Sequence, residues 1–323
     1  MRHRFSPLQS LLIPASGGTK PHLAERLTQE LQTPLLRPLP NNTPHRILSI
    51  DMGIRNLALC LLSIPPSQPP QISDWNRVTV SQKPDSSTIE SFEPLEYAQK
   101  AYSLMHSALQ SYRPHTILIE RQRYRSAGGA AIQEWTVRVN MLESMFHATL
   151  HTLAQTCGHD IVVRSVSPRR ITGFWLADVD EKMNVRETKM AKVACAERIV
   201  RGEESLDEGG MVEFVGEARM VAEGFNRGKR GDRSKFDDLA DSMLQGLGWW
   251  KWHVNRARMV DEILNREKEK VEMTEPVKVK GRRRLKVGVS PEDSIEEEIE
   301  KTVKRSRSVA KKGRERKKLE IHA

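Results

Sequence analysis

Two apolar runs joined by one short polar turn constrain the fold of this chain more than any other feature. The runs cover residues 47–50 and 57–64, and the turn between them begins with Asp51-Met52-Gly53. Apolar residues at successive positions are typical of strands buried on both faces, because alternate side chains of a strand point to opposite sides of its sheet. The sequence therefore predicts a sheet whose first strand ends in the carboxylate of Asp51.

The order of the remaining segments predicts an α/β fold. A weaker strand over 75–80 extends the first two strands into a meander. Helical spacing of apolar residues, or short buried runs, predicts the later elements in chain order: helix 92–113, strand 116–120, helix 131–156, strand 160–166, helix 185–201 and helix 235–265. This is the order of an RNase H-like fold, with a mixed five-stranded sheet flanked by helices.

The amino terminus supports two interpretations. The first acidic residue is Glu25, and the preceding residues are rich in Arg and Ser, which is compatible with a mitochondrial transit peptide over 1–33. The same residues also predict two short helices around a glycine turn at 16–20, which would form a small nucleic-acid-binding appendage. Both interpretations stay open at the level of the sequence.

Composition divides the rest of the chain into three parts. Four prolines predict a linker over 34–45. The main domain covers 46–265 and includes a mobile insertion over 202–234, which is rich in glycine and charge. Beyond residue 266 aromatic residues are absent and charge dominates, so we expect 266–323 to be a disordered tail.

Net charge points to a polyanionic partner. The chain has 52 Lys and Arg against 42 Asp and Glu, a formal charge of +10, which favours nucleic acid over a membrane surface. No apolar run is long enough to predict a transmembrane helix. The three cysteines lack the spacing of a zinc site or a disulfide framework. We therefore expect neither a membrane partner nor an organic cofactor.

Carboxylates from three separate segments are predicted to converge. Asp51 and Glu120 each end a buried strand, and the last helix carries an acidic face. This face consists of Asp237, Asp238 and Asp241, which have the i, i+3 and i, i+4 spacings of neighbours on a helix surface. Oxygen ligands without Cys or His favour Mg²⁺, with Mn²⁺ able to substitute. Two such ions can drive in-line hydrolysis of a phosphodiester.

A competing class shares the start of this pattern. In the actin-like and sugar-kinase fold, an Asp-x-Gly turn after the first strand binds nucleotide phosphate, and Asp51-Met52-Gly53 fits that role. Against it, Glu120 is followed by a basic and aromatic cluster over 121–125, which suits a phosphodiester backbone.

The sequence resembles a known family, the fungal mitochondrial Holliday-junction resolvases, or cruciform-cutting endonucleases, which are RNase H-like and related to the bacterial RuvC-type resolvases. The motifs that carry the resemblance are Ser49-Ile50-Asp51-Met52-Gly53-Ile54-Arg55-Asn56-Leu57-Ala58, Ile119-Glu120-Arg121-Gln122-Arg123-Tyr124-Arg125-Ser126, Trp135-Thr136-Val137-Arg138-Val139-Asn140-Met141-Leu142-Glu143 and Lys235-Phe236-Asp237-Asp238-Leu239-Ala240-Asp241-Ser242. The resemblance implies magnesium-dependent cutting of four-way DNA junctions by a mitochondrial homodimer. The amino-terminal part of the chain resembles a shortened form of the SAP-like helical motif that this family carries at the same end.

The resemblance also implies roles for individual residues. Asp51, Glu120 and Asp241 would be metal ligands, completed by Asp238 if the bacterial i, i+3 spacing holds or by Asp237 if the spacing is i, i+4. An alternative from the binding class is a relative that binds junctions or RNA without catalysis, although the complete acidic set argues against it.

Basic residues near these motifs are candidates for contacts with DNA phosphates. They are Arg121, Arg123, Arg125, Arg169, Arg170, Lys189 and Lys192. Each also has the simpler interpretation of a solvated surface cation. Tyr124 or Phe236 is a candidate wedge against exposed bases, or else part of the core. The helical stripe of Trp135, Leu142, Met145 and Phe146 predicts core, with a dimer interface as the alternative.

Overall fold

A computed structural model of the chain provides the fold. It describes residues 19–32, 36, 39–40, 43–66, 68–81, 92–122, 133–177, 183–204, 206, 210–227 and 236–273. The chain divides into two compact units, one of residues 38–249 and the other of residues 1–37 together with 250–323. The boundaries differ from the predicted domain 46–265, because the last helix continues from one unit into the other.

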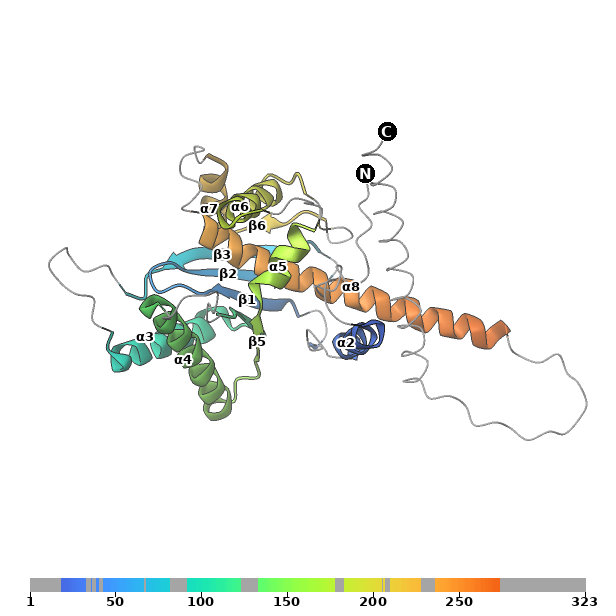
Figure 1. Cartoon of the computed structure of the whole chain (residues 1–323), viewed down its shortest axis with the longest axis horizontal. Coiled ribbons are helices and arrows are strands. Elements are labelled where there is room, and N and C mark those ends of the chain that lie inside the picture. Colours follow the sequence, from blue (N-terminus) through green and yellow to red (C-terminus); the bar gives the residue numbers. More distant parts are fainter. Residues whose placement is uncertain are drawn as a thin grey trace, which may run out of the picture. The chain divides into compact units, whose positions relative to one another are not determined.

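The larger unit is built on one mixed sheet (Figure 1). Its strands are β1 (His45–Asp51), β2 (Leu57–Ile64), β3 (Gln71–Val78), β4 (Thr116–Glu120), β5 (Val162–Val166) and β6 (Glu213–Phe214), in the spatial order β5-β4-β1-β2-β3-β6. β1, β2 and β3 form the predicted antiparallel meander, while β4 and β5 run parallel to β1. The prediction of five strands was wrong by one, because β6 pairs with β3 in parallel through only two residues.

The central strand β1 is buried on both faces, as its sequence predicts. One face packs against α3 (Pro94–Tyr112) and α4 (Glu134–Cys157), in a core that includes Leu48 and Ile50 from β1. By the alternation of strand side chains, Ser49 and Asp51 point to the other face. The position of Asp51 in β1 therefore directs its carboxylate away from the main core and toward the helices on the opposite side.

That opposite face is covered by helices that come later in the chain. They are α5 (Pro168–Trp175), α6 (Val185–Val200), α7 (Glu217–Arg227) and α8 (Asp237–Met273). α8 lies across the sheet in Figure 1, and the close approach of Gly246 to the sheet explains how it fits. A Cβ at Gly246 would lie 2.5 Å from Cδ1 of Leu62 and 3.2 Å from Cβ of Ser49.

The segment 202–234, predicted as a mobile insertion, contains regular structure. Both β6 and α7 lie within it, and α7 packs on β3. Ala218, Ala222 and Phe225 are buried at helical spacing, which is a periodic signal that the glycine and charge content of the segment concealed. Within this segment, residues 205, 207–209 and 228–234 lie outside the described residues.

The smaller unit contains α2 (Lys20–Gln32) and the part of α8 from residue 250. The guanidinium of Arg256 donates to the backbone carbonyls of Glu30 and Leu31 in the last turn of α2. α8 extends to Met273, beyond the predicted end at 265. Residues 1–18 and the rest of the predicted tail, 274–323, lie outside the described residues.

None of the helices in the described ranges is long and apolar enough to cross a membrane.

Candidate metal centre

Two of the predicted carboxylates lie side by side at one edge of the sheet. β1 and β4 run parallel with Ile50 opposite Ile119, so the next residue of each strand is Asp51 and Glu120 respectively. The two side chains lie close enough to interact directly, and repulsion from Glu120 adds to the effect of burial in raising the pKa of Asp51. Parallel pairing of two strands that end in a carboxylate is therefore the first element of the site.

The other carboxylates come from the first turns of α8. Asp241 repels both Asp51 and Glu120. Asp238 also repels Asp51, and Asp237 repels Asp241. Electrostatic interactions thus link all five predicted acidic residues, including both alternatives for the fourth ligand. We call these five residues the acidic cluster.

Burial makes negative charge costly in this cluster. Asp51 is only 7% exposed, and burial, reinforced by repulsion from Glu120 and Asp241, raises its pKa well above the usual value. Burial is also the largest cause of the raised pKa of Glu120 and of Asp241. Burial and then the neighbouring Asp237 raise the pKa of Asp238 to about 6. A cluster of this kind is stabilised by any cation that reaches its oxygens.

Two lysines of α6 bind the carboxylates of α8. Nζ of Lys192 lies 2.5 Å from Oδ2 of Asp241, and Nζ of Lys189 lies 2.7 Å from Oδ2 of Asp237. The hydrogen bond to Asp237 is the main reason that the pKa of Lys189 is raised. Both lysines were predicted as phosphate contacts, and in the free protein they are instead ion-paired within the acidic cluster.

Hydrogen bonds to the sheet and to α5 hold α8 in place next to the acidic cluster. The amide of Gln245 donates to Oγ of Ser49 and to the carbonyl of Ile50, each at 3.1 Å. The indole nitrogens of Trp75 and Trp175 donate to backbone carbonyls of α8, each at 2.9 Å. Gln245 thus ties α8 to the residue that directly precedes Asp51.

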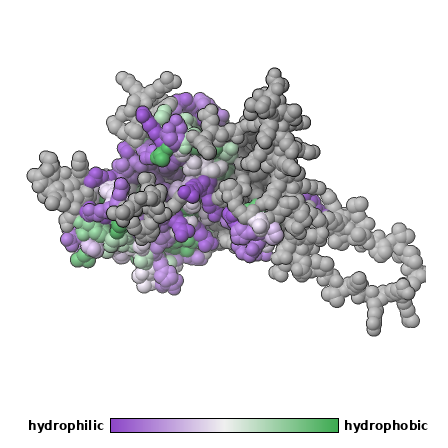
Figure 2. All heavy atoms as spheres, viewed as in Figure 1, coloured by the Kyte–Doolittle hydropathy of each residue, from purple (hydrophilic) through white to green (hydrophobic). Residues whose placement is uncertain are grey.

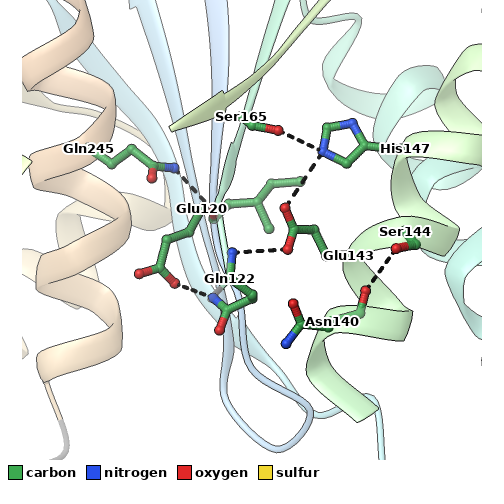
Figure 3. Close-up of polar contacts among 9 residues, drawn as sticks. Glu120, Gln122, Asn140, Glu143, Ser144, His147, Ser165 and Gln245 are labelled. Atoms are coloured by element: carbon green, nitrogen blue, oxygen red, sulfur yellow. Dashed lines mark hydrogen bonds and ion pairs between the residues drawn. The ribbon is translucent and has the colours of Figure 1, made fainter. Parts of the chain in front are cut away.

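A second network of polar contacts fixes Glu120 from the side of α4 (Figure 3). The side-chain amide of Gln122 donates to Oε2 of Glu120 at 2.8 Å, and its backbone N–H donates to Oε2 of Glu143 at 2.9 Å. His147 lies 4.0 Å from Glu143 and 3.1 Å from Oγ of Ser165 on β5. Sequence reasoning gave no role to Gln122, Glu143 or Gln245. Glu143 and Gln245 act through partners far away in the chain, and the bond from Gln122 to Glu120, two residues earlier, depends on the local backbone conformation.

The predicted basic contacts lie partly outside the described residues. Arg123, Tyr124 and Arg125 fall in this group. Arg121 directly follows Glu120 and is exposed, and its backbone N–H donates to Val166 at the end of β5. Arg169 and Arg170 lie in the first turn of α5, just beyond that same strand end. These three candidate arginines therefore follow the ends of β4 and β5, at the edge of the sheet that carries Asp51 and Glu120.

The aromatic candidates pack inside the protein to different extents. Phe236, a candidate wedge, contacts Phe225 of α7, with ring centroids 4.7 Å apart. Leu142 and Phe146 are fully buried and Met145 packs against the same core, which agrees with the predicted core stripe. Trp135 at the start of α4 is 40% exposed.

The donor chemistry of the cluster fits a hard divalent cation. Its side chains supply carboxylate oxygens, which are the ligands that Mg²⁺ prefers, and burial followed by repulsion from neighbouring carboxylates raises the pKa of Asp51 and of Asp241. Among the residues that the structure describes, no group of three or more His, Cys, Asp or Glu side chains is gathered closely enough to hold a metal ion as it stands. The acidic cluster therefore fits Mg²⁺ in the type of its ligands and in their position at the strand ends and at the start of α8.

Comparison with known proteins identifies the family. The family described as mitochondrial resolvase Ydc2 / RNA splicing MRS1 matches residues 47–259, which include every carboxylate of the cluster. The chain belongs to this family. Its RNase H-like fold, with a mixed sheet flanked by helices, is confirmed, and the actin-like interpretation was wrong.

Two mitochondrial endonucleases and one solved structure are similar to most of the chain. The mitochondrial cruciform cutting endonuclease 1 of Schizosaccharomyces pombe is 33% identical over 215 residues, covering 64% of this chain and 78% of the relative. The mitochondrial protein of the same name from Saccharomyces cerevisiae is 27% identical over 258 residues, covering 68% and 71%. The crystal structure of the yeast mitochondrial Holliday junction resolvase Ydc2 matches with a TM-score of 0.54 and 29% identity, covering 78% of this chain and 92% of that one.

Proposed function

We propose that this protein is a mitochondrial endonuclease that cuts four-way DNA junctions by magnesium-dependent hydrolysis of two phosphodiester bonds. The observation that carries the proposal is the convergence of Asp51, Glu120 and Asp241 from β1, β4 and α8 in one partly buried acidic cluster. The homologous cruciform-cutting endonucleases support the choice of DNA junctions as the substrate.

The residues of the cluster have separable roles in this reaction. Asp51, Glu120 and Asp241 would hold the cations, with Asp238 or Asp237 as a further ligand. Divalent cations bound there would activate water and stabilise the leaving oxygen of an in-line displacement. Gln122 and Gln245 orient the two strand ends, because they hydrogen-bond to Glu120 and to the carbonyl before Asp51.

DNA would approach across the edge of the sheet that carries the carboxylates. Arg121, Arg169 and Arg170 lie at this edge, and Arg123, Tyr124 and Arg125 follow Arg121 in the sequence. Guanidinium groups match the geometry of phosphate oxygens and would neutralise the backbone on either side of the scissile bond. The net charge of +10 favours the same partner.

A homodimer is part of the proposal. A four-way junction offers two equivalent strands, and a twofold-symmetric protein presents one active site to each. α3 and α4 carry exposed apolar side chains, namely Leu95, Tyr102, Trp135 and Val137. Hydrophobic surface gathers in this region in Figure 2. This face is therefore the candidate contact between two copies.

The deciding experiment is incubation of the purified protein with a labelled mobile four-way junction in Mg²⁺ and then in EDTA. A linear duplex and the Asp51→Asn variant are the controls. Symmetric nicks that appear on the junction alone, require Mg²⁺ and disappear in Asp51→Asn would support the proposal. Tight binding without cutting would contradict it and move the protein to the binding class.

The family description also includes RNA splicing, so a structured RNA belongs in the same experiment. Preferential binding of that RNA, together with no cleavage of the junction, would support a binding protein that lacks catalysis. The complete acidic cluster favours the nuclease, because a binding protein gains nothing from burying carboxylates that repel one another.

A further inference from the structure

The ammonium group of Lys192 lies inside the acidic cluster rather than on the surface. The side chain of Lys192 is 12% exposed and its Nζ is 2.5 Å from Oδ2 of Asp241, which is itself 25% exposed. The same charge also interacts favourably with Glu120. One lysine therefore neutralises part of the charge of carboxylates from two different segments.

The helix that carries Lys192 is well fixed. α6 begins with a capping box, in which the side chain of Asn184 accepts from the backbone of Glu187 and the side chain of Glu187 accepts from the backbone of Asn184. Val193 and Ala196 beside Lys192 are buried. Movement of the ammonium group must therefore come from the flexible four-carbon stem of the lysine, and the helix itself can stay in place.

A divalent cation and this ammonium group compete for the same oxygens. A cation coordinated by Asp51, Glu120 and Asp241 needs lone pairs of Asp241, and the ammonium of Lys192 already binds Oδ2 of that residue. The two positive charges would also repel each other strongly at this separation in a partly buried site. Oδ1 of Asp241 stays available to a cation, but repulsion between the cation and the ammonium group favours the departure of Lys192 from Asp241.

We propose that Lys192 is an exchangeable counter-ion, which stabilises the metal-free site by pairing with Asp241 and is released to a substrate phosphate when a divalent cation binds. This inference rests on the proposed metal site. It explains how a buried acidic cluster is tolerated before metal binds. It also makes cation binding and phosphate binding favour each other, because a phosphate that attracts Lys192 leaves Asp241 available to the cation.

Lys189 provides a matched comparison. It lies one helical turn before Lys192 and pairs with Asp237 at 2.7 Å, but its side chain is 54% exposed. Water already solvates much of that ammonium group, so its pairing contributes less to the charge balance of the buried centre. Removing either lysine deletes the same charge, and only Lys192 is expected to control access of the cation.

The first test measures the accessibility of the amine itself in the full-length protein. Reductive methylation with formaldehyde and cyanoborohydride, quantified by mass spectrometry, is compared in EDTA and in saturating Mg²⁺, without DNA. We expect methylation of Lys192 to accelerate several-fold with Mg²⁺, while Lys100, exposed on α3, and Lys251, buried on α8, keep their rates. Unchanged or slower methylation of Lys192 in protein that Mg²⁺ has thermally stabilised would overturn the proposal.

The second test measures the affinity for Mg²⁺ alone by calorimetry. Lys192→Met is expected to bind Mg²⁺ about tenfold more tightly, because it loses the competing charge, whereas Lys189→Met changes the affinity much less and Lys192→Arg keeps it near the original value. Equal effects of the two Met variants, or weaker binding by Lys192→Met, would contradict the exchange. Circular dichroism confirms that each variant is folded.

Failure of this inference differs from failure of the proposed nuclease activity. Both tests are performed without DNA, so a protein that exchanges Lys192 for Mg²⁺ but never cuts a junction would refute only the activity. Junction cleavage by a protein whose Lys192 never responds to Mg²⁺ would refute only the exchange.

Discussion

The side-chain amide of Gln245 on α8 donates a hydrogen bond to the backbone carbonyl of Ile50 at 3.1 Å, and Ile50 directly precedes Asp51. Asp241 lies one helical turn before Gln245 in the same helix. Because the same amide also binds Ser49, this one side chain sets the position of α8 relative to the end of β1. The distance between two proposed metal ligands therefore depends on a residue that binds no metal.

The first prediction concerns this link. Gln245→Met keeps the volume of the side chain and removes its hydrogen bonds to Ser49 and Ile50. We expect the free energy of unfolding to fall by about 1–3 kcal/mol, because buried polar groups lose their partner. Junction cleavage should also fall, by roughly tenfold, because α8 loses its register on β1. Urea unfolding and single-turnover cleavage measure the two effects.

Ser242→Ala is the matched control for Gln245→Met. Its hydroxyl donates to the carbonyl of Leu239 within the same helix, at 2.9 Å, so its loss does not disturb the contact between α8 and β1. An equal loss of cleavage in both variants would show that general destabilisation is responsible.

The second prediction concerns Asp51 in the metal-free protein. Its pKa in the folded state is raised above the unfolded value of 3.8, so its contribution to stability is fully present below that value and is lost as the pH rises through the folded pKa. We therefore expect Asp51→Asn in EDTA to have a higher Tm than the wild type near pH 7, and this advantage to shrink as the pH is lowered toward 4.

Added Mg²⁺ should make the Tm of the wild type higher than that of Asp51→Asn. Mg²⁺ is expected to raise the Tm of the wild type, because it binds the folded state only, and to have much less effect on Asp51→Asn. Thermal unfolding across pH, with and without Mg²⁺, measures both effects. Asp261→Asn, which removes an exposed carboxylate elsewhere on α8, should show neither. A lower Tm for Asp51→Asn in EDTA at pH 7 would contradict the prediction.

The third prediction concerns the contact between α8 and the sheet at Gly246. A Cβ added there would lie 2.5 Å from Cδ1 of Leu62 and 3.2 Å from Cβ of Ser49, so Gly246→Ala requires either the buried Leu62 side chain to repack or the helix to move away from β1 and β2. We expect a loss of about 1–3 kcal/mol in stability together with slower cleavage. Gly224→Ala in α7 is the control, since nothing lies within 4 Å of its added Cβ and alanine favours the helix. Equal stability of the two variants would disprove the close contact.

The fourth prediction concerns Glu143, which accepts the backbone N–H of Gln122. Glu143→Ala leaves that donor without its partner and frees the segment that follows Glu120, so we expect about tenfold slower cleavage. Glu143→Gln keeps an oxygen acceptor and should retain most of the activity. Cleavage at saturating junction separates this positioning effect from weaker binding, and an equal loss in both variants would point instead to the charge of Glu143.

The fifth prediction concerns phosphate contacts at the edge of the sheet. Arg169→Ala should weaken junction binding and reduce the dependence of its affinity on salt by about one unit in the logarithmic slope. Arg113→Asn removes a cation at the opposite edge, where asparagine tolerates the left-handed backbone at φ 44°, and should keep the slope. A salt series of Kd values for both variants is the measurement, and an unchanged slope for Arg169→Ala would exclude this contact.

Local patterns explain which parts of the fold could be predicted. The apolar runs around Asp51 and before Glu120 define buried strands without reference to any other segment, and the carboxylates stand at their ends by sequence alone. The periodic stripe through Leu142 and Phe146 predicts a buried helix face for the same reason. β6 escaped prediction because a strand of two residues has no pattern of its own and depends on β3 for pairing.

The tertiary structure alone decided the electrostatics of the site. In the sequence, Lys189 and Lys192 are cations on a helix, and their pairing with Asp237 and Asp241 depends on how α6 and α8 pack. Gln245 likewise acquires a role only through a strand almost two hundred positions earlier. The residue types and their order determined the fold class and the acidic set. The distances within the acidic cluster arise from the packing of segments that are far apart in the sequence. Because the strength of a hydrogen bond or an ion pair depends on these distances, no local sequence pattern could predict it.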